Sequence, residues 1–156
     1  MTRLMLAQGL RFDSVTHDGD YHYSGTLARF PAQVIGLMTP DARLAKVFVN
    51  LLTPDPDCRQ AYRDMKDVLG RKYGAPLLTL ERFDNPYYEG DGYELSAIKL
   101  GKGHFSTAWE QVSDNSADTA AVTVYIGRSL VVLLAYEGPR WNAEAERRAA
   151  KGTKAF

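Results

Sequence analysis

The chain has 156 residues, the size of a single domain that buries roughly 70% of the surface exposed by its unfolded form. Nineteen basic and nineteen acidic residues leave no net charge, so no overall positive field attracts phosphates, which argues against nucleic acid as the main partner. A hydrophobic fraction of 45% and a charged fraction of 24% are average for globular proteins and argue against disordered and fibrous classes.

The single cysteine, Cys58, excludes an intramolecular disulfide and a cysteine-rich zinc site. No apolar run approaches the ~20 residues that span a bilayer, and the apolar run after Met1 is too short for a secretory signal. We therefore expect one cytoplasmic domain over residues 1–156. A signal peptide upstream of Met1 would instead direct the protein to the periplasm or out of the cell.

The first half of the chain has the pattern of a strand meander. Residues 4–6, followed by Gly9, are typical of a helix that a glycine closes, and this helix is expected to begin upstream of the chain. An Asp-Gly dipeptide within residues 17–20 predicts a tight hairpin, and Pro31 is expected to interrupt strand pairing. Four strands are predicted here, at residues 10–16, 21–28, 33–38 and 44–52.

A helix is predicted at residues 56–73. Asp55 is expected to cap its first amides, and Pro56 suits the first helical position, where a missing N–H costs nothing. Apolar residues recur at steps of three and four and predict one buried stripe: Cys58, Ala61, Tyr62, Met65, Val68, Leu69 and Tyr73. Gly74 is expected to end the helix.

The second half repeats the alternation of strands and helices. Its strands are predicted at residues 77–83, 105–111, 122–126 and 130–136. Asp91 and Glu94 match a capping box, which predicts a short helix that Gly101 ends. Residues 113–118 are expected to form a polar loop.

Residues 141–151 are predicted to be helical, with a charged face in solvent, and residues 152–156 are expected to form a flexible tail. Together the elements predict an α+β domain of mainly antiparallel strands in two sets and two layers. The first set is a meander followed by a helix, and the second is a strand, a short helix, a meander and a helix. The pattern leaves open whether the strands form one sheet or two.

Several segments together resemble one bacterial family. They are residues 25–28, 62–69, 72–76, 97–98 and 101–102, Trp109, and residues 131–136. On these segments the chain is similar to small uncharacterised proteins, common in Bacteroidetes, in which a strand meander precedes a helix ending in Lys-Tyr-Gly-x-Pro. The resemblance implies this fold and no particular activity. It also implies an additional strand and helix upstream of Met1, often preceded by a signal peptide.

Two local groups suggest chemistry but have simpler explanations. His17 and His22, with the carboxylates between them, are ligands that Zn²⁺ accepts. An Asp-Gly hairpin with solvated side chains explains the same residues, so we expect no metal. Cys58 lies in the first turn of the predicted helix, where the helix dipole activates thiols. It also lies on the apolar stripe, and no histidine is near it in sequence, so we expect a core position.

Two further groups are expected to be structural. The Gly-Lys-Gly-His sequence of residues 101–104 suggests phosphate binding, but it lacks the spacing of a phosphate loop, so we expect a helix cap and a turn. Four carboxylates offer acid–base groups or ligands for a hard cation: Asp84, Glu89, Asp91 and Glu94. They lack the alternation of a calcium loop, and we expect a solvated loop.

The loop after the predicted strand at residues 77–83 is the preferred place for a partner. Tyrosine and tryptophan are enriched at binding hot spots because they combine large contact area with a polar group. The candidate surface consists of Tyr87, Tyr88, Tyr93 and Trp109. The leading hypothesis is a non-catalytic domain, without a cofactor, that binds a protein, a peptide or itself through this loop or an exposed sheet edge.

A hypothesis from another class is a small hydrolase or metal-dependent enzyme. It would use His17, His22, His104 or the acidic loop, because imidazoles and carboxylates supply acid–base groups and metal ligands. The sequence contains no evident acid, base and nucleophile in a recognisable spacing. The catalytic hypothesis therefore ranks second.

Overall fold

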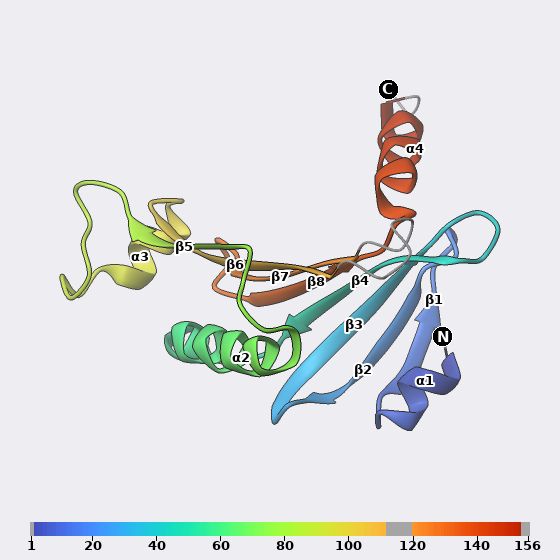
Figure 1. The fold of residues 1–156 in the computed structure, drawn as a ribbon, viewed down its shortest axis with the longest axis horizontal. Coiled ribbons are helices and arrows are strands. Elements are labelled where there is room, and N and C mark those ends of the chain that lie inside the picture. The colour runs from blue at the N-terminus through green and yellow to red at the C-terminus, as the bar shows by residue number, and fades with distance from the viewer. Residues whose placement is uncertain (1, 112–119, 154–156) are drawn as a thin grey trace.

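The structure is a computed structural model that describes residues 2–111 and 120–153, and it is a mixed α+β fold (Figure 1). Its strands are β1 (Arg11–Val15), β2 (Tyr21–Leu27), β3 (Phe30–Met38), β4 (Leu44–Leu51), β5 (Leu78–Phe83), β6 (Gly103–Gln111), β7 (Ala120–Ile126) and β8 (Val132–Glu137). Its α-helices are α1 (Thr2–Ala7), α2 (Cys58–Tyr73), α3 (Glu94–Lys99) and α4 (Trp141–Thr153). The predicted α+β class is confirmed.

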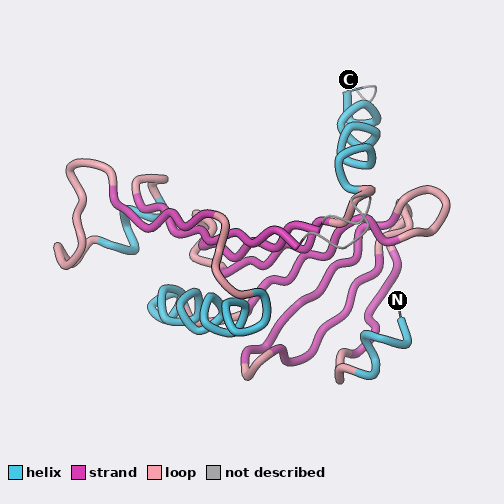
Figure 2. The backbone as a smooth tube through the Cα atoms, in the orientation of Figure 1, coloured by secondary structure: helices cyan, strands magenta, loops and turns pink. Residues whose placement is uncertain are grey.

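The eight strands of the described residues lie in one antiparallel sheet, with the order β1-β2-β3-β4-β8-β7-β6-β5. Each half of the chain contributes four neighbouring strands. The halves meet where β4 pairs with β8, and Val49 lies opposite Leu134 at this junction. Figure 2 shows the strands of the two halves side by side in one continuous sheet.

The core lies between the sheet and α2, which contacts β6, β7 and β8 (Figure 1). Five residues of α2 are buried there: Cys58, Ala61, Tyr62, Met65 and Leu69. The same face of the sheet contributes alternate residues of its strands, including Val34, Val49, Val124 and Leu134. The predicted core position of Cys58 is confirmed, and burial raises the pKa of its thiol.

The start of the long helix differs from the prediction. Residues Asp55–Asp57 form a 3₁₀ turn that leads directly into α2, and the Asp55 side chain makes no capping hydrogen bond. The proline in this turn still occupies an early position where its missing N–H is not needed. The predicted end is confirmed, since Gly74 has φ = 82° and donates its N–H to the Gly70 carbonyl.

The predicted interruption at Pro31 is wrong. Pro31 lies within β3 opposite Thr26, and its carbonyl accepts a hydrogen bond from the Leu52 N–H at 2.8 Å. The chain turns two to three residues before Pro31, at Ala28 and Arg29, which have φ = 49° and 93°. Two residues with positive φ form the tight hairpin whose twist matches the flanking strands, so β2 runs into β3 without a break.

The two helices of the second half also differ from their predicted bounds. Helix α3 begins only at Glu94, because the Asp91 carboxylate accepts the Tyr88 and Tyr93 amides within the preceding loop. Helix α4 continues through Thr153, so the tail predicted from residue 152 begins inside it, while residues 154–156 lie outside the described residues. The predicted polar loop at 113–118 also lies outside them. Within the described part of the chain, no helix has the length and apolarity to cross a membrane.

Candidate functional site

Strand β5 forms an open edge of the sheet with exposed leucines. It pairs with β6 on one side, and on its other side no strand of the described residues follows. Leu77, just before the strand, is 70% exposed, Leu78 is 64% exposed, and Leu80 is also exposed. Exposed apolar side chains on an edge strand are the combination that natural proteins usually avoid.

The backbone of β5 presents hydrogen-bonding groups outward. The Asp84 N–H donates to the Lys102 carbonyl opposite it at 2.7 Å. Because hydrogen-bonded and non-hydrogen-bonded positions alternate along an antiparallel pair, Leu78, Leu80 and Arg82 direct their backbone groups toward β6. Thr79 and Glu81 therefore direct their N–H and C=O groups away from the sheet, where a further strand would pair.

The opposite edge, strand β1, is less suited to pairing. Its register shifts between Phe12 and Ser14, and such a bulge disturbs the ladder of an edge. Arg11 and Asp13 form an ion pair at 3.2 Å on this strand, and α1 packs beside it. The two edges thus differ, and β5 is the more regular and more apolar one.

A cavity of about 550 Å³ lies beside β5 on the face of the sheet that α2 covers. Its floor is aromatic: the Tyr62 and Phe83 rings each contact the Phe105 ring edge-on, with centroid distances of 5.9 and 5.5 Å. The loop at residues 84–93 closes one side of the cavity through Tyr87, Tyr88 and other residues. The cavity therefore combines an apolar floor with a wall of loop residues.

A hydrogen-bonded chain fixes the floor of this cavity. The Tyr62 hydroxyl lies 2.7 Å from the Thr107 hydroxyl and donates to Glu81 at 3.0 Å, and Lys66 donates to the same carboxylate at 2.6 Å. Burial raises the pKa of Tyr62. Burial alone would also raise the pKa of Glu81, but the hydrogen bonds from Lys66 and Tyr62 lower it. Glu81 is therefore held as a carboxylate and Tyr62 as a neutral phenol.

Three arginines line the cavity wall: Arg59, Arg63 and Arg82. Arg59 comes from the first turn of α2, and its guanidinium lies 5.0 Å from the Phe105 ring centroid and 5.7 Å from that of Phe83. It donates to both oxygens of Glu89 at 2.8 and 2.6 Å. The cavity thus presents a cation held against two aromatic rings.

The structure brings together part of the predicted tyrosine surface. Tyr87 is half-buried in the cavity wall, and Tyr88 beside it is exposed. Tyr93 is exposed at the start of α3 and does not line the cavity. Trp109 does not belong to the surface, because it is 2% exposed in the core and donates from Nε1 to the Gly74 carbonyl at 3.0 Å. Alternation along β6 directs it toward α2.

His104 lies far from the other two histidines. His17 and His22 flank the β1–β2 turn, whereas His104 lies on β6, five strand spacings or roughly 24 Å from β2. His104 pairs with Asp84 at 2.7 Å, and this hydrogen bond lowers the pKa of Asp84. Among the described residues, no hydroxyl or thiol hydrogen-bonds to the His104 ring, and no group of three or more His, Cys, Asp or Glu side chains is arranged to hold a metal.

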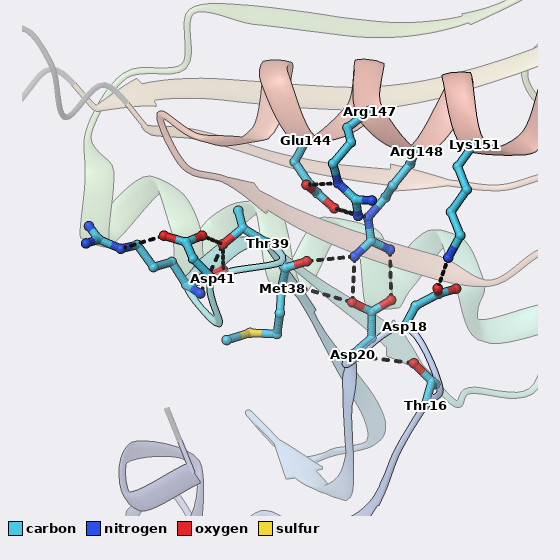
Figure 3. Close-up of polar contacts among 11 residues, drawn as sticks. Thr16, Asp18, Asp20, Met38, Thr39, Asp41, Glu144, Arg147, Arg148 and Lys151 are labelled. Atoms are coloured by element: carbon cyan, nitrogen blue, oxygen red, sulfur yellow. Dashed lines mark hydrogen bonds and ion pairs between the residues drawn. The ribbon is translucent and has the colours of Figure 1, made fainter.

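Sequence reasoning missed an ionic network that fastens α4 to the β1–β2 turn (Figure 3). Arg148 donates to both oxygens of Asp20, at 2.8 and 2.7 Å, and to the Met38 carbonyl at 2.9 Å. It also donates to Glu144 at 2.7 Å, and Arg147 donates to both oxygens of Glu144. Glu144 and Asp20 are buried, so the expectation of a solvated helix face and solvated turn is wrong for these residues.

The network keeps both buried carboxylates ionised. Hydrogen bonds from Arg147 and Arg148 lower the pKa of Glu144 to about 2. Burial alone would raise the pKa of Asp20, but hydrogen bonds from Arg148 and the Met38 N–H lower it. Every charge of this network has an opposite charge within hydrogen-bonding distance. The network therefore holds α4 in place through charges that are paired among the described residues.

Comparisons with known protein families, with characterised proteins and with solved structures find no match to this chain. The bacterial family resemblance therefore stays a prediction. The candidate site consequently depends on geometry alone: the outward backbone groups of β5, its exposed leucines, and the arginine-lined aromatic cavity beside them.

Proposed function

We propose that this protein is a binding domain that receives an extended segment of a partner protein along β5. The observation that carries the proposal is the unpaired edge of β5, where Thr79 and Glu81 offer outward N–H and C=O groups next to exposed leucines. An extended peptide that adds to a sheet edge gains affinity from main-chain hydrogen bonds and specificity from pockets for alternate side chains. Both requirements are met at this edge.

The added strand would present its two faces to two different surfaces. Side chains on one face would lie over Leu78 and Leu80, which favours apolar residues. Side chains on the other face would point toward α2 and the cavity, as those of Glu81 and Phe83 do. A two-layer arrangement, with α2 as one layer and the sheet as the other, is part of this proposal because it places the cavity under the added strand.

A proline substitution tests the main-chain contact directly. Thr79→Pro removes an outward N–H that no β6 group uses, and prolines are tolerated on sheet edges. Wild-type protein would first be used to select binders from a phage library of random seven-residue peptides. Because the lost hydrogen bond and the fixed φ both oppose pairing, the selected peptides are expected to bind Thr79→Pro about tenfold or more weakly, measured by fluorescence polarisation.

The matched control is Thr79→Ala, which removes the side chain and keeps the backbone N–H. Its affinity is expected to stay within about twofold of wild type, since the main-chain hydrogen bond is retained. Equal affinity of wild type, Thr79→Ala and Thr79→Pro would refute pairing along β5. Circular dichroism melting of both variants establishes that the sheet is intact.

The tyrosine loop is expected to contribute to the same site. Replacing Tyr87 and Tyr88 with serine removes aromatic area from the cavity wall. The selected peptides are therefore expected to bind more weakly while the domain stays folded. Light scattering after size-exclusion chromatography tests a competing occupant. A stable dimer that Thr79→Pro dissociates would assign the edge to a second copy of the chain and contradict a separate partner.

A further inference from the structure

The cavity beside β5 is already occupied at its charged end by a carboxylate of the chain itself. Glu89, from the loop at residues 84–93, accepts hydrogen bonds from Arg59 on both of its oxygens. Its side chain is 66% exposed, whereas that of Arg59 is largely buried against two aromatic rings. A pair with one partner in solvent contributes little stability and opens readily. Arg59 is thus a fixed cation with an exchangeable carboxylate.

One donor of Arg59 is left without an acceptor. Its Nε is shielded from solvent and has no hydrogen-bond partner among the described residues, while Glu89 contacts only Nη2. A guanidinium binds a carboxylate most strongly when two adjacent N–H groups donate to its two oxygens. A carboxylate placed across Nε and Nη2 would satisfy the orphan donor, which Glu89 does not do. Arg63 and Arg82 add positive charge to the same cavity.

We infer that the segment bound along β5 carries an acidic side chain, which replaces Glu89 on Arg59. This inference depends on the proposed function, because a strand paired with β5 directs alternate side chains toward α2 and the cavity. The neighbouring side chains of that strand lie on the other face, over Leu78 and Leu80. The ligand is therefore an extended peptide with an aspartate or glutamate between apolar residues, and Glu89 is an internal competitor.

Three variants of the full chain test the inference with the same phage library of random seven-residue peptides. Wild type is expected to enrich Asp or Glu at one position between apolar residues. Arg59→Gln is expected to keep the apolar alternation and lose the acidic preference. Glu89→Gln is expected to bind the wild-type-selected peptide about two- to fivefold more tightly, because the competing ion pair is a weak, exposed one. Arg71→Gln, an exposed change on the same helix, is the control and is expected to keep the acidic preference.

The selection distinguishes a failure of the carboxylate site at Arg59 from a failure of strand pairing along β5. Enrichment of apolar peptides without an acidic position, or an acidic preference that Arg59→Gln retains, overturns the carboxylate site and leaves pairing along β5 standing. An absence of enriched peptides on wild type overturns the proposed function together with this inference. Because Glu89 is exposed, Glu89→Gln is expected to fold normally, so unchanged affinity of this variant contradicts the competitor role even where Arg59→Gln is unstable.

Discussion

Replacing Arg148 with methionine tests whether the ionic network fastens α4 to the sheet. Methionine keeps most of the apolar stem of arginine but removes every hydrogen bond of the guanidinium. Among the described residues, Asp20 would then retain only the Met38 N–H, at 3.0 Å, and Glu144 would retain only Arg147. Two buried carboxylates would lose their shared cation.

The expected cost follows from the burial of these groups. Removing one partner of a buried ion pair costs roughly 3–5 kcal/mol because a buried charge is left uncompensated. Arg148 is 25% exposed, and each carboxylate keeps one donor, so the lower end applies and we expect Arg148→Met to cost about 3 kcal/mol. That is a large fraction of the roughly 5–15 kcal/mol by which native domains are stable.

Urea denaturation followed by circular dichroism measures this cost. With a slope of about 1–3 kcal/mol per molar, a loss of about 3 kcal/mol lowers the midpoint by about 1 M or more at an unchanged slope. Arg147→Met is the matched control, because Arg147 is more exposed and, among the described residues, binds only Glu144; its urea midpoint is expected to shift much less than that of Arg148→Met. Equal costs for the two variants would refute a specific role of Arg148.

Three further changes are expected to alter stability. The native pKa of Glu144 is about 2, and that of Asp20 lies below its ordinary value. Both carboxylates therefore contribute stability that is present above about pH 4.5 and is lost as the pH drops toward 2. Measuring the melting temperature across this pH range tests the loss. Gly103→Ala should cost about 1–3 kcal/mol in urea, since its new Cβ would lie 2.7 Å from Ile98 Cγ1; an unchanged midpoint would contradict this packing. Arg29→Gly should add about 1 kcal/mol by relieving a φ of 93°, and a lower calorimetric melting temperature would count against that strain.

The elements of the fold were largely predictable because their signals are local. An Asp-Gly dipeptide between alternating strands specifies the β1–β2 hairpin, where Gly19 has φ = 85°. The apolar stripe of α2 and the glycine after it likewise belong to one continuous segment. Such signals do not state which strands from different halves become neighbours. The pairing of β4 with β8 connects residues 81 to 91 positions apart and depends on the final packing.

The candidate site was predictable only in part for the same reason. The tyrosine loop is visible as a composition change, and the structure places Tyr87 and Tyr88 at the cavity. The floor of the cavity comes from three separate elements, and only the fold brings Tyr62 and Phe105 together. Trp109 illustrates the opposite error, since nearness in sequence suggested a surface that strand alternation excludes.

The ionic network could not be predicted from the sequence. Asp20 and Arg148 are separated by 128 positions, and each lies in a segment whose composition is typical of solvent exposure. Charged residues are exposed by default, and only a specific partner at close range makes burial tolerable. A buried Asp20 in the β1–β2 turn therefore becomes recognisable only once α4 is placed.

The proposed function requires a partner strand that pairs with β5. Amide hydrogen exchange measured by NMR, with and without a selected peptide, tests it most directly. The Thr79 and Glu81 amides are expected to exchange rapidly in the free protein and to become strongly protected in the complex. Protection that appears elsewhere in the sheet, with unchanged exchange at Thr79 and Glu81, would contradict it.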